Sequence, residues 1–163
     1  MTDETLSEGL ARYIASLSFD TLPGTIANAA KLHILDSLGC LIAGSRLGPG
    51  KLAYDMAAAN SSANLTSPLL GSDRRAGDLE AVQAMSVAAH CGEMDDIHGG
   101  AGTCIGAMII PALIAMAAKY GGSGRNFVAA TIAGYETIIR VGLSIDAPKL
   151  FAHGWWPSTH RRE

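Results

Sequence analysis

The sequence predicts an all-α domain, and two observations support that prediction. Apolar residues recur at three- and four-residue intervals along most of the 163 residues, the spacing that gives a helix one apolar face. No segment shows the apolar–polar alternation that is typical of an amphipathic strand. We find neither an internal repeat nor a low-complexity linker, so residues 1–163 are expected to form a single helical domain.

Two segments near the N-terminus carry clear helical spacing. In the first, apolar residues recur from Leu6 to Leu17, and Thr2 or Asp3 is expected to cap this helix. The second helix is expected at residues 23–43. Its later half is apolar on most sides, which indicates a helix buried at the centre of the fold.

Four further helices follow from the same spacing. They are expected at residues 51–59, 79–90, 105–120 and 123–145. Glycine and proline mark loops between them, at residues 48–50 and within residues 60–72. The last stretch, residues 148–163, contains an aromatic cluster that includes Trp156 and is assigned no regular structure.

Composition restricts the class of protein. Hydrophobic residues make up 48% of the chain and charged residues 17%, which favours a packed core over disorder. A net charge of −3 gives no reason to expect a nucleic-acid partner. The three cysteines are expected to be reduced thiols of a cytoplasmic protein. The longest apolar stretch, residues 104–118, is interrupted by Pro111 and is shorter than the roughly 20 residues of a membrane span, so no membrane partner is expected.

Polar residues concentrate in one window, residues 90–111. Two histidines, two cysteines and three carboxylates lie there among several glycines, between two apolar helical segments. Glu93, Asp95, Asp96 and His98 fall within six residues of one another. A packed helical domain has little structural need for such a group, so this window is the predicted functional site.

Three interpretations of the window remain open. The common metal-ligand types are all present, but no subset has the spacing of a zinc signature, and we assign neither a metal nor an organic cofactor. The acidic residues could instead form a solvated turn at a helix end. In the third interpretation, carboxylates beside a histidine act as general acid or base. The free N–H groups of the helix after Thr103 would then receive a substrate carboxylate.

Several segments in order along the chain resemble the MmgE/PrpD family, which includes dehydratases of 2-methylcitrate, decarboxylases of cis-aconitate and epimerases of iminodisuccinate. The resemblance covers nearly the whole chain. The matching segments are Leu35-Asp36-Ser37-Leu38-Gly39, Leu70-Gly71-Ser72, Glu93-Met94-Asp95-Asp96-Ile97-His98, Gly106-Ala107-Met108-Ile109-Ile110-Pro111-Ala112, Gly134-Tyr135-Glu136 and Gly154-Trp155-Trp156-Pro157. Each segment is short, and their order and spacing together carry the resemblance.

This resemblance implies a cofactor-free lyase or isomerase of a small di- or tricarboxylate. Its chemistry would be proton abstraction next to a carboxylate, followed by dehydration, decarboxylation or epimerisation. The fold implied is the helical bundle of the family's larger domain, which forms a homodimer. The catalytic residues implied are Asp95, Asp96 and His98. Substrate-binding roles are expected for Glu93, Thr103, Cys104 and Trp156.

The chain departs from the family pattern at three places. A histidine that many relatives carry before the apolar helix falls at Cys104, with Thr103 beside it. The histidine of the family's later aromatic motif is matched by Trp156. Ile97 stands where the decarboxylase-like members have threonine. These departures leave the reaction and the substrate open.

Family chains continue far beyond the position of Glu163, into an α+β lid domain and its substrate-holding lysines. We therefore expect this chain to be the leading part of such a protein: a truncated product, a split subunit or a fragment. It would associate with copies of itself or with a chain that supplies the remainder. Two alternatives stay open, a non-catalytic helical dimerisation module and a metal-dependent enzyme centred on His90, Asp95 and His98.

Overall fold

The computed structural model of the chain describes residues 4–60 and 65–154. In these residues, helices dominate and a single pair of two-residue strands is present. The helices are α1 (Leu6–Ser16), α2 (Gly24–Gly44), α3 (Gly48–Asn60), α4 (Asp78–His90), α5 (Ile105–Tyr120), α6 (Gly124–Ser144) and α7 (Ala147–Ala152). A 3₁₀ turn, η1 (Phe19–Thr21), follows α1, and the strands are β1 (Ser67–Pro68) and β2 (Arg75–Ala76). The prediction of an all-α domain is confirmed.

Most helix boundaries lie close to the predicted ones. α5 has the predicted bounds, and α2, α4 and α6 begin and end within one residue of theirs. The expected cap of α1 was wrong. Thr5, rather than Thr2 or Asp3, caps the helix, because its side chain accepts from the backbone N–H of Glu8 while the Glu8 carboxylate accepts from Thr5. This reciprocal capping box satisfies two N–H groups at the helix start.

Two segments expected to be loops contain regular structure. α3 begins at Gly48, three residues before its predicted start, because Pro49 is tolerated in a first turn whose N–H groups have no helical partner anyway. The predicted loop at 60–72 contains β1, which pairs antiparallel with β2. α7 occupies part of the stretch for which no helix was predicted.

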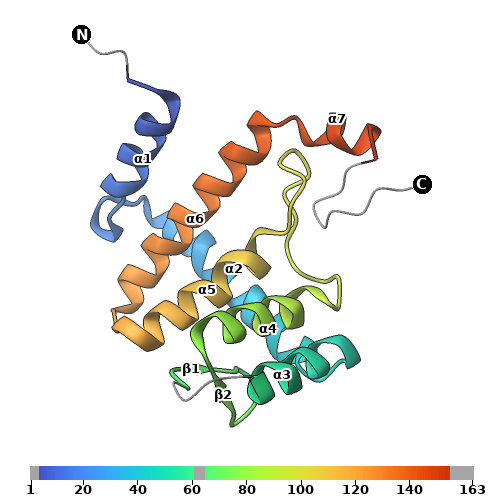
Figure 1. Ribbon diagram of the computed structural model, residues 1–163. Coiled ribbons are helices and arrows are strands. Elements are labelled where there is room, and N and C mark those ends of the chain that lie inside the picture. Colours follow the sequence, from blue (N-terminus) through green and yellow to red (C-terminus); the bar gives the residue numbers. More distant parts are fainter. Residues whose placement is uncertain (1–3, 61–64, 155–163) are drawn as a thin grey trace.

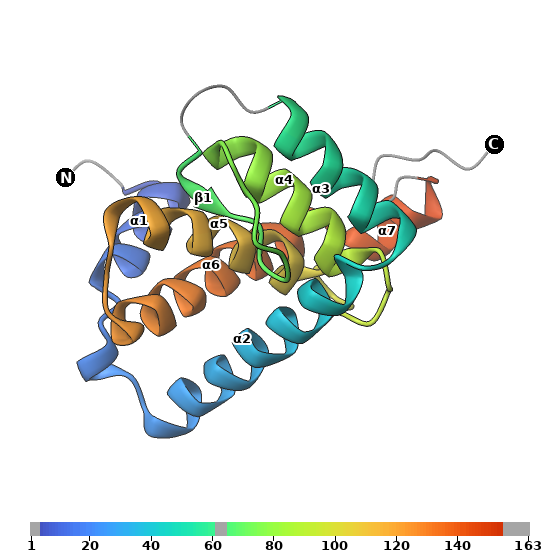
Figure 2. The same cartoon turned by 90° about the horizontal axis from the view of Figure 1, so that it is seen from below.

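Four helices stack in sequence, α6, α5, α4 and α3, so that each packs against the next (Figure 1). α2 runs along one side of this row and contacts α4, α5 and α6, with its outer side uncovered by the rest of the described chain (Figure 2). The main core lies where α2, α3, α4 and α5 meet. It is built around Leu41, Tyr54 and Met85, and small residues such as Ala84 and Ala88 bring the helices close together.

Two glycines allow the closest approach in the fold. At Gly44, the end of α2 meets the carbonyl of Ala88 in α4 so closely that a Cβ would overlap it. A Cβ at Gly50, in the first turn of α3, would in turn overlap the Gly44 carbonyl. This contact fixes the C-terminal end of α4, from which the polar loop departs.

By length and hydropathy alone, two of the described helices, α2 and α6, would be able to cross a membrane. Core helices of soluble proteins meet the same criterion, and here both helices pack against α5. Cytoplasmic localisation stays a prediction.

Candidate active site

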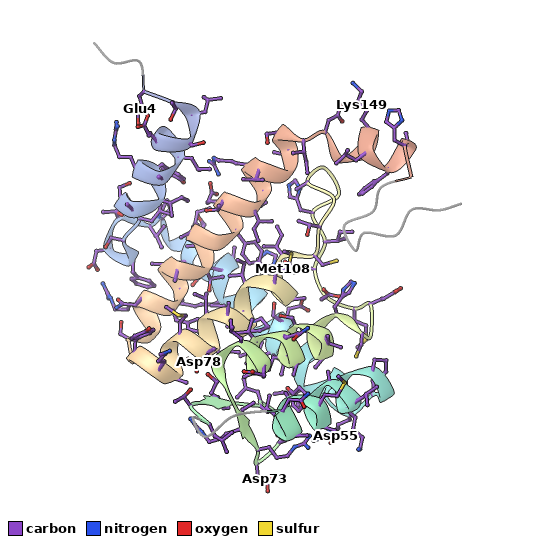
Figure 3. The ribbon with its side chains drawn as sticks, in the orientation of Figure 1. Glu4, Asp55, Asp73, Asp78, Met108 and Lys149 are labelled. Carbon is purple, nitrogen blue, oxygen red and sulfur yellow. The ribbon has the colours of Figure 1, made fainter. Side chains whose placement is uncertain are left out.

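The predicted site residues that the structure describes all lie in or beside one loop, residues 91–104, which connects α4 to α5 (Figure 1). Met108, labelled near the start of α5 in Figure 3, marks the point where this loop re-enters the bundle. Trp156, the remaining predicted site residue, lies outside the described residues.

Hydrogen bonds to backbone groups within the loop fix its conformation. Glu93 has a φ of +49°, a left-handed conformation uncommon for a residue with a side chain, and its N–H donates to the carbonyl of His90 at 2.9 Å. Further on, His98 and Thr103 form an isolated antiparallel bridge in which the His98 N–H donates to the Thr103 carbonyl at 3.0 Å. Nδ1 of His98 accepts from the Ala101 N–H at 2.9 Å, so the ring proton sits on Nε2.

Asp95 is the buried centre of one polar group. Its side chain is only 1% exposed, and its two carboxylate oxygens lie 3.0 and 3.1 Å from Nδ1 of His90, the last residue of α4. The sulfur of Cys104, at the start of α5, lies within 4.8 Å of this carboxylate. Burial, reinforced by the negative charge of Asp95, raises the pKa of the Cys104 thiol to about 11.

Asp96 faces a second group, made of two side chains, from α2 and α6, and a backbone N–H of α5. Oδ1 accepts from the backbone N–H of Gly106 at 2.9 Å, in the first turn of α5. Oδ2 accepts from the Tyr135 hydroxyl of α6 at 2.7 Å and lies 3.0 Å from Nδ1 of His33 in α2. A carboxylate at this place is stabilised by the free N–H groups and positive dipole end of α5.

Burial raises the pKa of the Tyr135 phenol, and its hydrogen bond to the Asp96 carboxylate raises it further. The Ser37 hydroxyl is near enough to oppose this rise in part. Ser37 is buried, and its hydroxyl makes no hydrogen bond of normal geometry to a described residue. A Cβ at Gly106 would overlap this hydroxyl and lie 2.7 Å from Oδ1 of Asp96. Only glycine therefore fits here without displacing the polar group.

The structure thus divides the predicted residues rather than gathering them at one point. Asp95 and Cys104 lie together, whereas Asp96 faces α2 and α6. His98 is bound within its own loop, and the Thr103 hydroxyl donates to the sulfur of Met108 at 3.3 Å. Glu93 is exposed to solvent.

Two adjacent aspartates each bind the Nδ1 atom of a different histidine. From the sequence, His90 was placed only in the metal alternative, and His33 was not assigned to the site. His33 lies in the helix that was expected to be buried at the centre of the fold, but its side chain is 47% exposed and paired with Asp96. Its i,i+4 relation to Ser37 on one face of α2 was a usable signal. The separation of 39 residues between Asp96 and Tyr135 left no such signal.

A shallow groove between α2 and α6 begins at this second pair. Its volume is about 170 Å³. His33, Tyr135 and Glu136 supply its polar groups, and Ile26, Ile132 and Ile139 supply much of its apolar lining. The half-exposed ring of His33 therefore has an open space beside it.

Together, the fold and the site define an all-α domain whose α4–α5 loop supplies two aspartates, each paired with a histidine of a neighbouring helix. A family model described as the MmgE/PrpD N-terminal domain matches residues 8–160, so the chain belongs to the MmgE/PrpD family. A cis-aconitate decarboxylase from Aspergillus terreus is 26% identical over 151 residues, which cover 90% of this chain and 31% of that protein. A cis-aconitate decarboxylase-like protein, oryM, from Aspergillus oryzae is also 26% identical, over 95% of this chain and 34% of its own length. The chain therefore spans about a third of the length of these relatives.

Proposed function

We propose that this chain supplies the helical part of a lyase or isomerase that removes a proton next to a carboxylate of a small di- or tricarboxylate. Membership of the MmgE/PrpD family supports an enzyme domain of this kind. The two relatives named above are called cis-aconitate decarboxylase or a protein like it, which favours a tricarboxylate among possible substrates.

The observation that carries the proposal is the Asp95–His90 pair. A buried carboxylate bound to Nδ1 fixes the orientation and tautomer of the imidazole and leaves the Nε2 lone pair free. The His90 side chain is 53% exposed, so Nε2 can reach a bound substrate. His90 would then take the proton, and Asp95 would be a positioning residue rather than the base.

The neighbouring groups complete a proton-transfer site in this proposal. Nε2–H of His98 can donate a hydrogen bond to a substrate carboxylate. Asp96 holds the start of α5 in place, and the exposed Glu93 and the Thr103 hydroxyl, both in the same loop, would contact the substrate. We further propose that a segment or chain beyond the described residues supplies the remaining substrate-binding groups.

The proposal is tested by following proton exchange directly. The purified chain is incubated in D₂O with cis-aconitate, 2-methylcitrate and related di- and tricarboxylates, and NMR records deuterium uptake and substrate loss. Substituting His90→Gln should lower the exchange rate by about 100-fold or more, the usual effect of losing a general base. His153→Gln, at an exposed histidine after α7, is the matched control and should leave the rate unchanged.

Two results would contradict the proposal. An unchanged exchange rate in His90→Gln would show that His90 is not the base. Absence of exchange with every substrate, together with no binding by calorimetry, would instead favour a non-catalytic helical module. The apolar outer side of α2, where Leu32 and Leu35 are each 67% exposed, is the observation that supports this second candidate.

A further inference from the structure

Three side chains with different donor atoms converge beside the C-terminal end of α4. A ring nitrogen of His90, a carboxylate oxygen of Asp95 and the sulfur of Cys104 all lie within 4.8 Å of one another. Sequence spacing grouped His90 and Asp95 with His98, but the structure brings Cys104 to them instead, because the loop returns to the bundle at residue 104.

We propose that His90, Asp95 and Cys104 form a binding site for a zinc ion. Imidazole nitrogen, carboxylate oxygen and thiolate sulfur are the ligand types that zinc takes in proteins. Three protein ligands would leave the fourth tetrahedral position open to water or another small ligand.

The spacing of the donors suits a tetrahedral ion. At metal–ligand bonds of roughly 2.0–2.3 Å, neighbouring ligand atoms stand roughly 3–4 Å apart. The His90 Nδ1 atom already lies 3.0 and 3.1 Å from the two Asp95 oxygens. Since all three donor atoms lie within 4.8 Å of one another, binding requires them to close by about 1 Å.

Charge and access favour a cation at this place. Asp96 and the exposed Glu93 add negative charge around the three ligands. This charge contributes to the raised pKa of the Cys104 thiol. The Asp95 carboxylate is buried and held by its neighbours, whereas the half-exposed His90 ring offers a path from solvent. When zinc binds, the Cys104 thiol releases its proton to water, and its sulfur and the Asp95 carboxylate then share the metal ion.

A metal ion here would occupy the same atoms that the proposed proton transfer uses. The ion would bind the His90 ring, so that the hydrogen bond between His90 and Asp95 is lost. It would also neutralise the Asp95 carboxylate that orients the base. Zinc is therefore expected to act as an inhibitor of that reaction, not as its cofactor. The metal site itself does not rest on the proposed function, since it requires no turnover.

Cobalt(II) serves as the spectroscopic probe, because a cobalt–thiolate bond gives a charge-transfer absorption in the near ultraviolet that other ligands do not. The complete chain is titrated with Co²⁺ in the presence of a reductant that contains no thiol. We expect one equivalent to bind with this absorption, and one equivalent of Zn²⁺ to abolish it. Cys104→Ser should eliminate the absorption, and His90→Gln should weaken Co²⁺ binding at least tenfold.

Cys91→Ser provides the matched control. Cys91 lies in the same loop, but its thiol contacts the carbonyls of Gly44 and Ala88, so this variant should keep the absorption. Absence of the absorption in the unmodified chain would overturn the proposal, and so would its persistence in Cys104→Ser. Circular dichroism confirms that each variant is folded, and His90→Gln tests the site without altering a thiol. Because no step measures turnover, a negative result leaves the proposed function standing.

Discussion

Asp96 joins three helices through a single carboxylate. It accepts hydrogen bonds from the start of α5 and from Tyr135 in α6, and it pairs with His33 in α2. Its side chain is 19% exposed, so most of these contacts lie away from water. A residue that the sequence indicates only as part of an acidic pair thus has a clear structural role.

Asp96→Asn should lower the free energy of unfolding by about 1–3 kcal/mol. The amide keeps the size of the side chain but has only one acceptor oxygen, so it cannot serve both Gly106 and Tyr135. Urea denaturation followed by circular dichroism measures the change. Asp36→Asn, at an exposed position of α2, is the control and should change stability by less than about 0.5 kcal/mol. Equal stability of the two variants would show that the Asp96 contacts contribute nothing.

Single-residue roles in the site were predictable only where the partners lie near one another along the chain. Asp95 and Asp96 stood out because acidic residues are rare between two apolar helices. Their opposite orientations could not be inferred, since these depend on how α2 and α6 approach the loop. Cys104 was expected to replace a family histidine, and its contact with Asp95 follows from the folded loop rather than from spacing.

The first turn of α5 has to pass very close to α2. Gly106→Ala should lower the free energy of unfolding by about 1–3 kcal/mol, because the added methyl group would overlap the Ser37 hydroxyl and crowd the Asp96 carboxylate. Gly39→Ala is a matched control inside α2, with no atom within 4 Å of the new methyl group. That variant should be about 0.5–1 kcal/mol more stable than the unmodified chain, since alanine favours a helix over glycine. Thermal unfolding would contradict the close contact if both variants were stabilised.

Asp78 ties the start of α4 to two other elements. It accepts from Ser67 in β1 at 2.8 Å and pairs with Lys119 near the end of α5 at 2.6 Å. The hydrogen bond from Lys119 is the largest of the effects that lower the pKa of Asp78 from 3.8 to about 2. A lowered pKa means that the folded state binds this proton less readily than the unfolded chain does.

The contribution of Asp78 to stability should therefore be complete above about pH 4 and be lost as the pH falls towards 2. In Asp78→Asn, the decrease in stability across this range should be smaller than in the unmodified chain. Acid titrations of both proteins, monitored by circular dichroism, provide the measurement. The difference should also diminish in high salt because the pair is partly exposed. Parallel titration curves would exclude the effect.

At the scale of elements, the sequence predicted most of the fold. α5 was located to the residue because its apolar run begins after a polar loop and ends at Gly121-Gly122. The start of α3 was missed because Gly48-Pro49-Gly50 has the composition of a loop, although Pro49 suits the first turn of a helix and Gly50 packs closely on Gly44. Strands as short as β1 and β2 have too few residues to show any periodicity.

For the whole molecule, the dominant feature is the uncovered side of α2. Leu32 and Leu35 point outward from the described chain, and Ile26 and Ile42 are also substantially exposed. Because this helix was expected to be buried on most sides, we propose that another protein segment covers this surface. We expect copies of this chain to associate through it when no other segment is present.

Sedimentation velocity of the unmodified chain should therefore show concentration-dependent oligomers. The double substitution Leu32→Asp and Leu35→Asp should shift the chain towards monomer, because charges would have to be buried at the interface. Leu79→Asp alters a side chain that is 82% exposed on α4 and should leave the distribution unchanged. A monodisperse monomer at all concentrations would rule out self-association through α2.

The two adjacent aspartates also limit how the α4–α5 loop can vary in length. One residue inserted between Asp95 and Asp96 would move one of them out of reach of its histidine, and one inserted directly before Gly106 would shift the cap of α5. The tip differs, because Gly99 is exposed and a Cβ there would meet nothing within 4 Å. Insertions should therefore be tolerated near Gly99, at the tip of the loop, and be disruptive beside the two aspartates and Gly106. The length of this surface loop is thus fixed where it joins the helices and free to vary at its tip.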